Sequence, residues 1–247
     1  MRALRVVLSV CLLAMMMASC SPHNNASGPI VVAVIDTGIA ENSVTELRDY
    51  TIENQTEPVS GEHGTMMASV LLGVNDEGAE ALPPDRVVLV SYDIGENATA
   101  TGIAEAIEAA VDRRVDVISI SMGVRQDSPR LREAVRIAEE AGIPIIAAAG
   151  NVRFLASDFP ARCSSVVSVS AVDSAGEWWS DAARREVDAV ADGVDVSVLA
   201  PNGEVRLESG TSISTAAVTH QLVSALIAGE VDSVHDFRFP QPPDGND

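Results

Sequence analysis

The sequence contains no lysine. Its 16 basic residues are all arginines and are outnumbered by 36 acidic residues, which gives a formal net charge of −20. Because this charge repels phosphate backbones and anionic lipid headgroups, we expect neither a nucleic acid nor an anionic lipid surface as a partner. The excess of acidic residues commonly serves solubility alone. A more specific interpretation is that it favours cationic substrates.

Aromatic residues are also scarce, with two Trp, two Tyr and four Phe in 247 residues. The hydrophobic share is nevertheless 47%, so a core must be built from Val, Ile, Leu, Ala and Met. Small β-branched side chains suit sheets that are buried on both faces. The composition therefore favours a tightly packed α/β architecture, and the length suits one large domain or two small ones.

Cysteine occurs three times, and Cys11 lies in an apolar segment near the N-terminus. Apart from Cys20, which follows that segment, this leaves Cys163 as the single cysteine of the globular part. One cysteine cannot form an internal disulfide there. We expect Cys163 to be a small buried hydrophobic residue rather than a nucleophile.

The apolar run near the N-terminus is short. It extends from Val6 to Ala18 and is preceded by two arginines. This run has the length of a signal-peptide core and is too short to span a bilayer. The segment Met17-Ala18-Ser19-Cys20 resembles the lipobox of bacterial lipoproteins, which implies that Cys20 becomes the lipidated first residue after export. An ordinary cleaved signal peptide, with Cys20 incidental, is the alternative.

This resemblance implies a signal peptide over residues 1–19 and a lipidated polar tether over residues 20–28. The protein would then be exported and lipid-anchored to a membrane of a bacterial cell envelope, the outer membrane if the host is Gram-negative. The remainder divides into one domain over residues 29–230 and a tail over residues 231–247. The tail is rich in proline and acidic residues, so we expect it to be disordered.

Apolar runs rich in β-branched residues alternate with helical patterns throughout the domain. The patterns predict strands over residues 30–35, 87–92, 115–120, 143–149, 166–172 and 194–199, and helices over residues 65–72, 99–113, 128–141 and 213–228. Strand–helix alternation with continuously apolar strands predicts an α/β fold with three layers. In it, a mostly parallel sheet is covered by helices on both faces.

Three short segments combine residue types that act together in nucleophilic catalysis. Asp36 follows a buried strand and precedes Thr-Gly, His63 lies at the first turn of an expected helix, and Ser212 follows Gly-Thr at the start of another. A serine hydroxyl is a weak nucleophile and needs a base within hydrogen-bond reach. A histidine can serve as that base, and a carboxylate can fix its tautomer and stabilise its cation.

Each of these segments has an ordinary interpretation when taken alone. An Asp-Thr-Gly motif also occurs in aspartic peptidases, where two such carboxylates share a proton. This chain has one copy, so a homodimer would be required, and the α/β alternation does not suit that all-β fold. A lone histidine at a helix start is commonly a cap, and Gly-Thr-Ser is an ordinary helix start.

Taken in order, the three segments resemble the catalytic Asp, His and Ser blocks of the subtilisin-like serine peptidases. The resemblance implies a catalytic triad of Asp36, His63 and Ser212. The segment Ala147-Ala148-Ala149-Gly150-Asn151 resembles the one that supplies the oxyanion-hole Asn, here Asn151. The segment Ser119-Ile120-Ser121-Met122-Gly123 resembles the strand that pairs with the substrate backbone, which implies substrate binding by Ser121, Met122, Gly123 and Gly150.

The sequence departs from this family at a few positions. Ala216 stands where the family usually has a proline, and Val124 stands where a second glycine is frequent. Val124 would narrow the substrate channel, which favours a restricted specificity. Asn75-Asp76-Glu77-Gly78 could hold a structural calcium ion, although an acidic surface turn explains it as well. We expect no required cofactor and no catalytic metal.

These observations predict a serine endopeptidase that hydrolyses polypeptide substrates and acts as a monomer. Its activity should fall as His63 becomes protonated, near or below about pH 6.5. Two alternatives stay open. One is a catalytically impaired lipoprotein that binds peptides or serves as a scaffold, and the other is a processing peptidase dedicated to one partner.

Overall fold

The computed structural model describes residues 28–40, 44–56, 61–75 and 80–243. Seven strands form one sheet in the order β2-β3-β1-β4-β5-β6-β7, and every pairing is parallel. The strands are β1 Ile30–Asp36, β2 Thr51–Asn54, β3 Val87–Asp93, β4 Val117–Ile120, β5 Ile145–Ala148, β6 Val166–Val172 and β7 Ala189–Asp192. The chain leaves β1 for strands on one side and later returns to pair β4 on the other. In open α/β sheets such a reversal marks the place where ligands bind, which here is at the carboxyl ends of β1 and β4.

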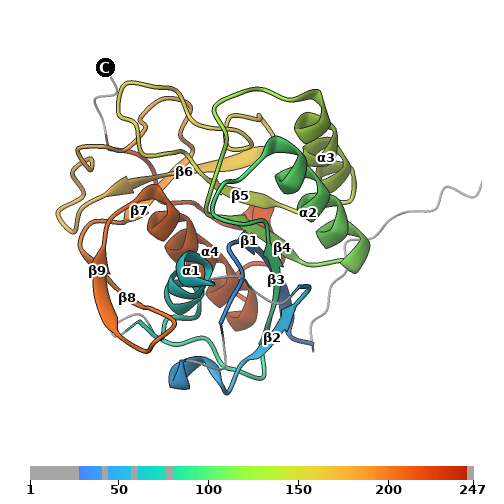
Figure 1. The fold of residues 1–247 in the computed structure, drawn as a ribbon, viewed down its shortest axis with the longest axis vertical. Helices are drawn as coiled ribbons and strands as arrows, with labels where there is room; N and C mark the ends of the chain where they lie inside the picture. Colours follow the sequence, from blue (N-terminus) through green and yellow to red (C-terminus); the bar gives the residue numbers. More distant parts are fainter. Residues whose placement is uncertain (1–27, 41–43, 57–60, 76–79, 244–247) are drawn as a thin grey trace, which may run out of the picture.

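Helices cover both faces of the sheet, as Figure 1 shows. Helices α1 (Glu62–Leu72) and α4 (Thr211–Ala228) pack on one face, and α2 (Ala100–Arg113) and α3 (Pro129–Glu140) pack on the other. Strand β1 supplies both cores by alternation, because Val32 and Val34 join the first core while Ala33 and Ile35 join the second. The expected three-layer α/β fold with a parallel sheet is therefore confirmed.

The helix boundaries follow local capping chemistry. The side chain of Thr99 accepts a hydrogen bond from Gly102 N at 3.0 Å, and the side chain of Ser128 accepts one from Leu131 N at 3.4 Å. These residues cap α2 and α3 as Thr and Ser commonly do. Helix α1 begins at Glu62, earlier than the expected start at Thr65, and its N-cap residue, Gly61, has the left-handed conformation.

Four strands differ from expectation, because one pairs outside the main sheet and three were not predicted. Residues 194–199 contribute β8 (Val196–Leu199), but this strand pairs antiparallel with β9 (Val205–Glu208) in a separate two-stranded hairpin rather than in the main sheet. The sequence patterns did not predict β9, and they also missed β2 and β7, the two edge strands of the main sheet. Both are four residues long, and β2 has little apolar content, so their pairing depends on neighbours rather than on local pattern.

The chain after residue 230 differs from the expected disordered tail. Residues 234–236 form a short 3₁₀ turn, and the Pro240 carbonyl accepts a hydrogen bond from Val190 N of β7 at 3.0 Å. Phe237 and Phe239 pack edge to face, with ring centroids 5.0 Å apart, against the α1/α4 core. The prediction of disorder is therefore wrong for residues 231–243, because two half-buried aromatic rings and an edge-strand hydrogen bond hold this segment to the domain.

The proposed signal peptide and Cys20 lie outside the described residues, as do residues 244–247. Within the ranges described, no helix is long and apolar enough to cross a membrane. Cys163 is 6% exposed and belongs to the α2/α3 core, and burial raises the pKa of its thiol. It is therefore the buried hydrophobic residue that the sequence predicted.

Candidate active site

Asp36 is the last residue of β1 and is completely buried at the carboxyl end of the sheet. Its Oδ1 atom accepts hydrogen bonds from the Thr37 backbone N–H at 2.7 Å and from His63 Nδ1 at 2.8 Å, and its Oδ2 atom lies 3.0 Å from the same ring nitrogen. A buried carboxylate is costly unless it is paired, so these contacts fix both partners. They also require a proton on His63 Nδ1, which leaves Nε2 as the ring nitrogen able to accept one.

Helix α1 lies unusually close to the end of β1. A Cβ atom at Gly64 would lie 2.1 Å from the Gly38 carbonyl oxygen and 3.3 Å from Asp36 Cβ. The Gly64 N–H, which belongs to the unpaired first turn of the helix, donates to Thr37 Oγ1 at 3.0 Å. The Asp-Thr-Gly and His-Gly segments thus fit together, and this approach brings His63 to Asp36.

Burial lowers the pKa of His63, but Asp36 beside the ring, together with smaller contributions from Glu96 and Glu208, more than offsets that effect. The net result is a pKa raised above the ordinary value of 6.5. We therefore expect the fall in activity to occur at a higher pH than the sequence alone predicted, because the acidic surroundings stabilise the imidazolium form.

Ser212 is the second residue of α4, where backbone N–H groups have no partner within the helix. Its carbonyl oxygen accepts a hydrogen bond from Ser121 Oγ at 3.3 Å. Ser121 directly follows β4, so the nucleophile candidate and the expected substrate-binding segment 121–123 are in direct contact. Met122 packs against the α2/α3 core, which holds that segment in place.

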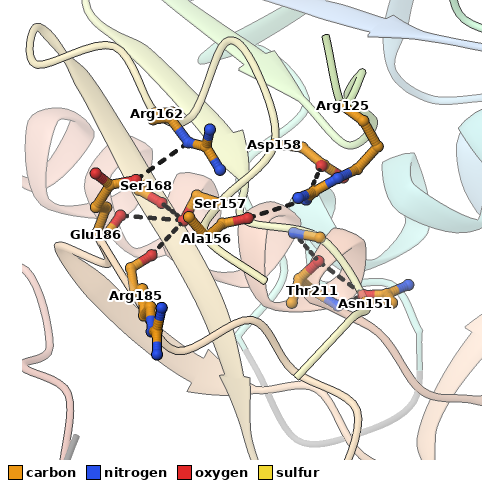
Figure 2. Close-up of polar contacts among 11 residues, drawn as sticks. Arg125, Asn151, Ala156, Ser157, Asp158, Arg162, Ser168, Arg185, Glu186 and Thr211 are labelled. Atoms are coloured by element: carbon orange, nitrogen blue, oxygen red, sulfur yellow. Dashed lines mark hydrogen bonds and ion pairs between the residues drawn. The ribbon is translucent and has the colours of Figure 1, made fainter. Parts of the chain in front are cut away.

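The side chain of Asn151 is held by Thr211 (Figure 2). Its Oδ1 atom accepts hydrogen bonds from the Thr211 backbone N–H at 3.0 Å and from Thr211 Oγ1 at 2.8 Å, and Thr211 Oγ1 in turn accepts from Gly150 N at 3.1 Å. Because the Thr211 amide can only donate, the amide orientation of Asn151 is settled. Its Nδ2 donor points away from these contacts.

The side chains of Ser212 and Asn151 both lie close to Gly210. A point at the Cβ position of Gly210 lies 3.5 Å from Ser212 Oγ and 3.4 Å from Asn151 Nδ2. The hydroxyl of Ser212 and the amide donor of Asn151 therefore lie on the same side of Gly210. Among the described residues, no hydrogen bond joins the His63 ring to Ser212 Oγ; such bonds are commonly long in enzymes without substrate.

Two site residues carry contacts that sequence reasoning did not assign. Thr37 ties α1 to β1, and Thr211 orients Asn151. Both stand inside motifs that the sequence displays, Asp-Thr-Gly and Gly-Thr-Ser. Their positions inside those motifs are the signal that could have identified them, since Thr hydroxyls at turns and helix starts commonly bond backbone groups.

The described residues contain no group of three or more His, Cys, Asp or Glu side chains that could hold a metal ion. Asn75, the first residue of the candidate calcium segment, is buried and donates its side-chain amide to the Ser197 carbonyl at 2.8 Å. Residues 76–78 of that segment lie outside the described part of the chain.

Comparison with curated proteins finds several peptidases. The chain is 32% identical over 218 residues to the thermostable alkaline protease of Halalkalibacterium halodurans, covering 85% of this chain and 60% of that protein. It is 29% identical over 219 residues to thermitase of Thermoactinomyces vulgaris, covering 84% and 77%, and 31% identical over 202 residues to subtilisin of Bacillus pumilus, covering 75% and 72%.

Solved structures share the fold. The prenylagaramide maturation protease PagA is 26% identical, with a TM-score of 0.69 over 86% of this chain and 79% of PagA. The patellamide maturation protease PatA is 22% identical, with a TM-score of 0.70 over 87% and 84%. The sequence model of the subtilase family matches residues 27–235, which is most of the chain. The chain therefore belongs to the subtilase family of serine peptidases.

Proposed function

We propose that the chain is a serine endopeptidase in which Asp36, His63 and Ser212 form the catalytic triad. Family membership and similarity to thermitase and subtilisin support the class of activity. The single observation that carries the assignment of residues is the buried hydrogen bond of 2.8 Å between Asp36 and His63 Nδ1. It leaves Nε2 of the same ring as the base for a serine hydroxyl.

The reaction follows from these positions. Ser212 Oγ attacks the substrate carbonyl carbon while His63 Nε2 takes the hydroxyl proton, and Asp36 stabilises the resulting imidazolium. The negative charge that develops on the carbonyl oxygen is met by Asn151 Nδ2 and by the Ser212 backbone N–H at the start of α4. His63 then donates its proton to the leaving amine, and water hydrolyses the acyl-enzyme with the same base.

Labelling with a fluorophosphonate probe tests this proposal. Such a probe reacts only with a serine that is activated as a nucleophile, so we expect the full chain to be labelled at pH 8. Ser212→Ala should abolish the label, whereas the matched variant Ser214→Ala should keep it, since Ser214 Oγ is buried and donates to the Ala191 carbonyl at 3.0 Å. A chain that folds but takes no Ser212-dependent label would refute the proposed activity and favour the catalytically impaired alternative.

A narrower function, a peptidase dedicated to processing one partner, is favoured by the similarity to a maturation protease of 26% identity. The backbone of Val124 forms two hydrogen bonds of 2.9 Å with Phe159, which hold Val124 in place directly after the expected substrate-binding segment 121–123. A dedicated enzyme should take the fluorophosphonate label but leave unfolded casein intact. Extensive digestion of casein would point to a general endopeptidase.

We also propose that the protein is exported and anchored to a bacterial envelope membrane through a lipid on Cys20, and that it acts as a monomer. The support for the anchor is the sequence around Cys20, preceded by an apolar run of signal-peptide length.

A further inference from the structure

The carboxylate of Asp158 lies against two glycines of the substrate-binding segments. A Cβ atom at Gly150 would lie 2.6 Å from Asp158 Oδ2, and one at Gly123 would lie 2.8 Å from Asp158 Cβ. Any larger residue at either position would collide with this side chain. The absence of both side chains therefore leaves room for a carboxylate between the segments that end at Gly123 and Gly150.

Backbone pairing holds Asp158 in this place. Asp158 N donates to the Ala149 carbonyl at 2.8 Å, and the next residue, Phe159, exchanges two hydrogen bonds of 2.9 Å with Val124. The segments that carry Gly123, Gly150 and Asp158 are thus joined to one another. The carboxylate is a fixed part of the site rather than the end of a mobile surface side chain.

Arg125 forms an ion pair with the Asp158 carboxylate from its more exposed side (Figure 2). Its guanidinium donates to Asp158 Oδ1 at 2.5 Å and to the Ala156 carbonyl at 2.9 Å. The Arg125 side chain is 43% exposed, whereas that of Asp158 is 16% exposed. An ion pair with so exposed a partner contributes little to stability, so another cation can replace Arg125 at small cost.

The position of Asp158 relative to Ser212 and Asn151 determines which substrate residue its carboxylate can contact. Gly150 directly precedes Asn151, and both are tied to Thr211 beside Ser212. A substrate carbonyl between Ser212 Oγ and Asn151 Nδ2 therefore places its own residue next to Gly150. The side chain of that residue, on the acyl side of the cleaved bond, is the one that would meet Asp158.

We propose that Asp158 determines specificity by binding a cationic side chain, Arg or Lys, on the acyl side of the cleaved bond, and that Arg125 occupies the carboxylate when substrate is absent. This inference rests on the proposed peptidase function. A substrate guanidinium can form two parallel hydrogen bonds with a carboxylate. Glu96 and Glu208, which act electrostatically on His63, and the net charge of −20 also favour cationic peptides at this site.

The test uses fluorogenic peptides that differ only in the acyl-side residue: Arg, its uncharged isostere citrulline, Leu or Glu. We expect kcat/KM for Arg to exceed that for citrulline about 10- to 100-fold, the value of a charged hydrogen bond. Asp158→Asn should reduce the Arg rate to the citrulline rate and leave the citrulline rate in place. Arg125→Gln should raise the Arg rate, because the competing cation is gone.

Control variants and a binding measurement keep the outcomes distinct. Glu108→Gln and Arg130→Ala break a similarly exposed ion pair on the α2/α3 surface and should leave the Arg-to-citrulline ratio unchanged. The same ratio, measured as Kd on Ser212→Ala, tests recognition without turnover. A chain without fluorophosphonate labelling refutes the proposed activity. If the chain is labelled but its Arg-to-citrulline ratio is unchanged by Asp158→Asn, this inference is wrong and the proposed activity stands. A preference for Glu that depends on Arg125 would have the same consequence.

Discussion

At the scale of single residues, His63 links activity and stability to pH with opposite signs. Asp36, with Glu96 and Glu208 further away, outweighs burial and raises the pKa of His63 above 6.5. The protonated ring is thus favoured in the folded state, and its contribution to stability is complete below the unfolded pKa of about 6.5. That contribution is lost as the pH rises through the folded pKa, which is the range where the neutral base becomes available.

We expect the acid limb of kcat/KM to have its midpoint above about pH 6.5, because this parameter reports the free enzyme's base. Glu208→Gln should move the midpoint to lower pH by removing one carboxylate that favours the imidazolium. Glu230→Gln, located after α4, is the control and should leave the midpoint in place. A midpoint below pH 6 would contradict the role of the acidic surroundings.

At the scale of elements, the approach of α1 to β1 depends on one missing side chain. The hypothetical Cβ of Gly64 overlaps a backbone carbonyl rather than the flexible end of a side chain, so the overlap can be relieved only by moving the helix. Moving α1 would also carry His63 away from Asp36. The same position therefore bears on the stability of the fold and on the geometry of the site.

Gly64→Ala should lower the free energy of unfolding by about 1–3 kcal/mol, the usual cost of overpacking, and reduce kcat more than it raises KM. Gly102→Ala in α2 is the matched control. Its Cβ would meet only the Thr99 hydroxyl, at 3.2 Å, and Ile94 Cβ, at 3.8 Å, and alanine in place of glycine commonly stabilises a protein where the backbone is already helical. Urea unfolding compares the two; equal midpoints would disprove the steric argument.

Element pairing also shows where local pattern is insufficient. The strands with continuous Val and Ile content, such as β1 and β6, match their predicted ranges closely. The edge strand β7 is four residues long, half of them alanine, and nothing in that pattern indicates pairing. The segment after residue 230 is rich in proline but carries two phenylalanines whose binding surface is formed by distant residues.

At the scale of the whole molecule, the charge of −20 constrains how the protein can stay at a membrane. Anionic lipid repels such a surface, so electrostatic attraction would add little to the lipid proposed on Cys20. One acyl chain binds only weakly, so stable anchoring requires the several chains that bacterial lipoproteins are expected to carry.

Cys20→Ser should therefore shift the exported protein from the membrane fraction to the soluble fraction, by at least about tenfold, since little electrostatic attraction remains. Flotation of membranes at low and high salt measures the distribution. Cys11→Ser, within the apolar segment, is the control and should stay with the membrane. A Cys20→Ser protein that floats with the membrane at both salt concentrations would refute the anchor.

The sequence by itself determined the order and chemistry of the three blocks and the α/β alternation, because these depend on local residue types and on periodicity. It also placed Asp36 at the end of a buried strand, where the structure brings His63 to it. Only the tertiary structure decided that Thr211 orients Asn151, that Arg125 covers Asp158 between two glycines, and that the segment after residue 230 packs on β7. Each of these contacts joins residues far apart in the chain, and their meeting is set by strand register and helix packing, which no local pattern encodes.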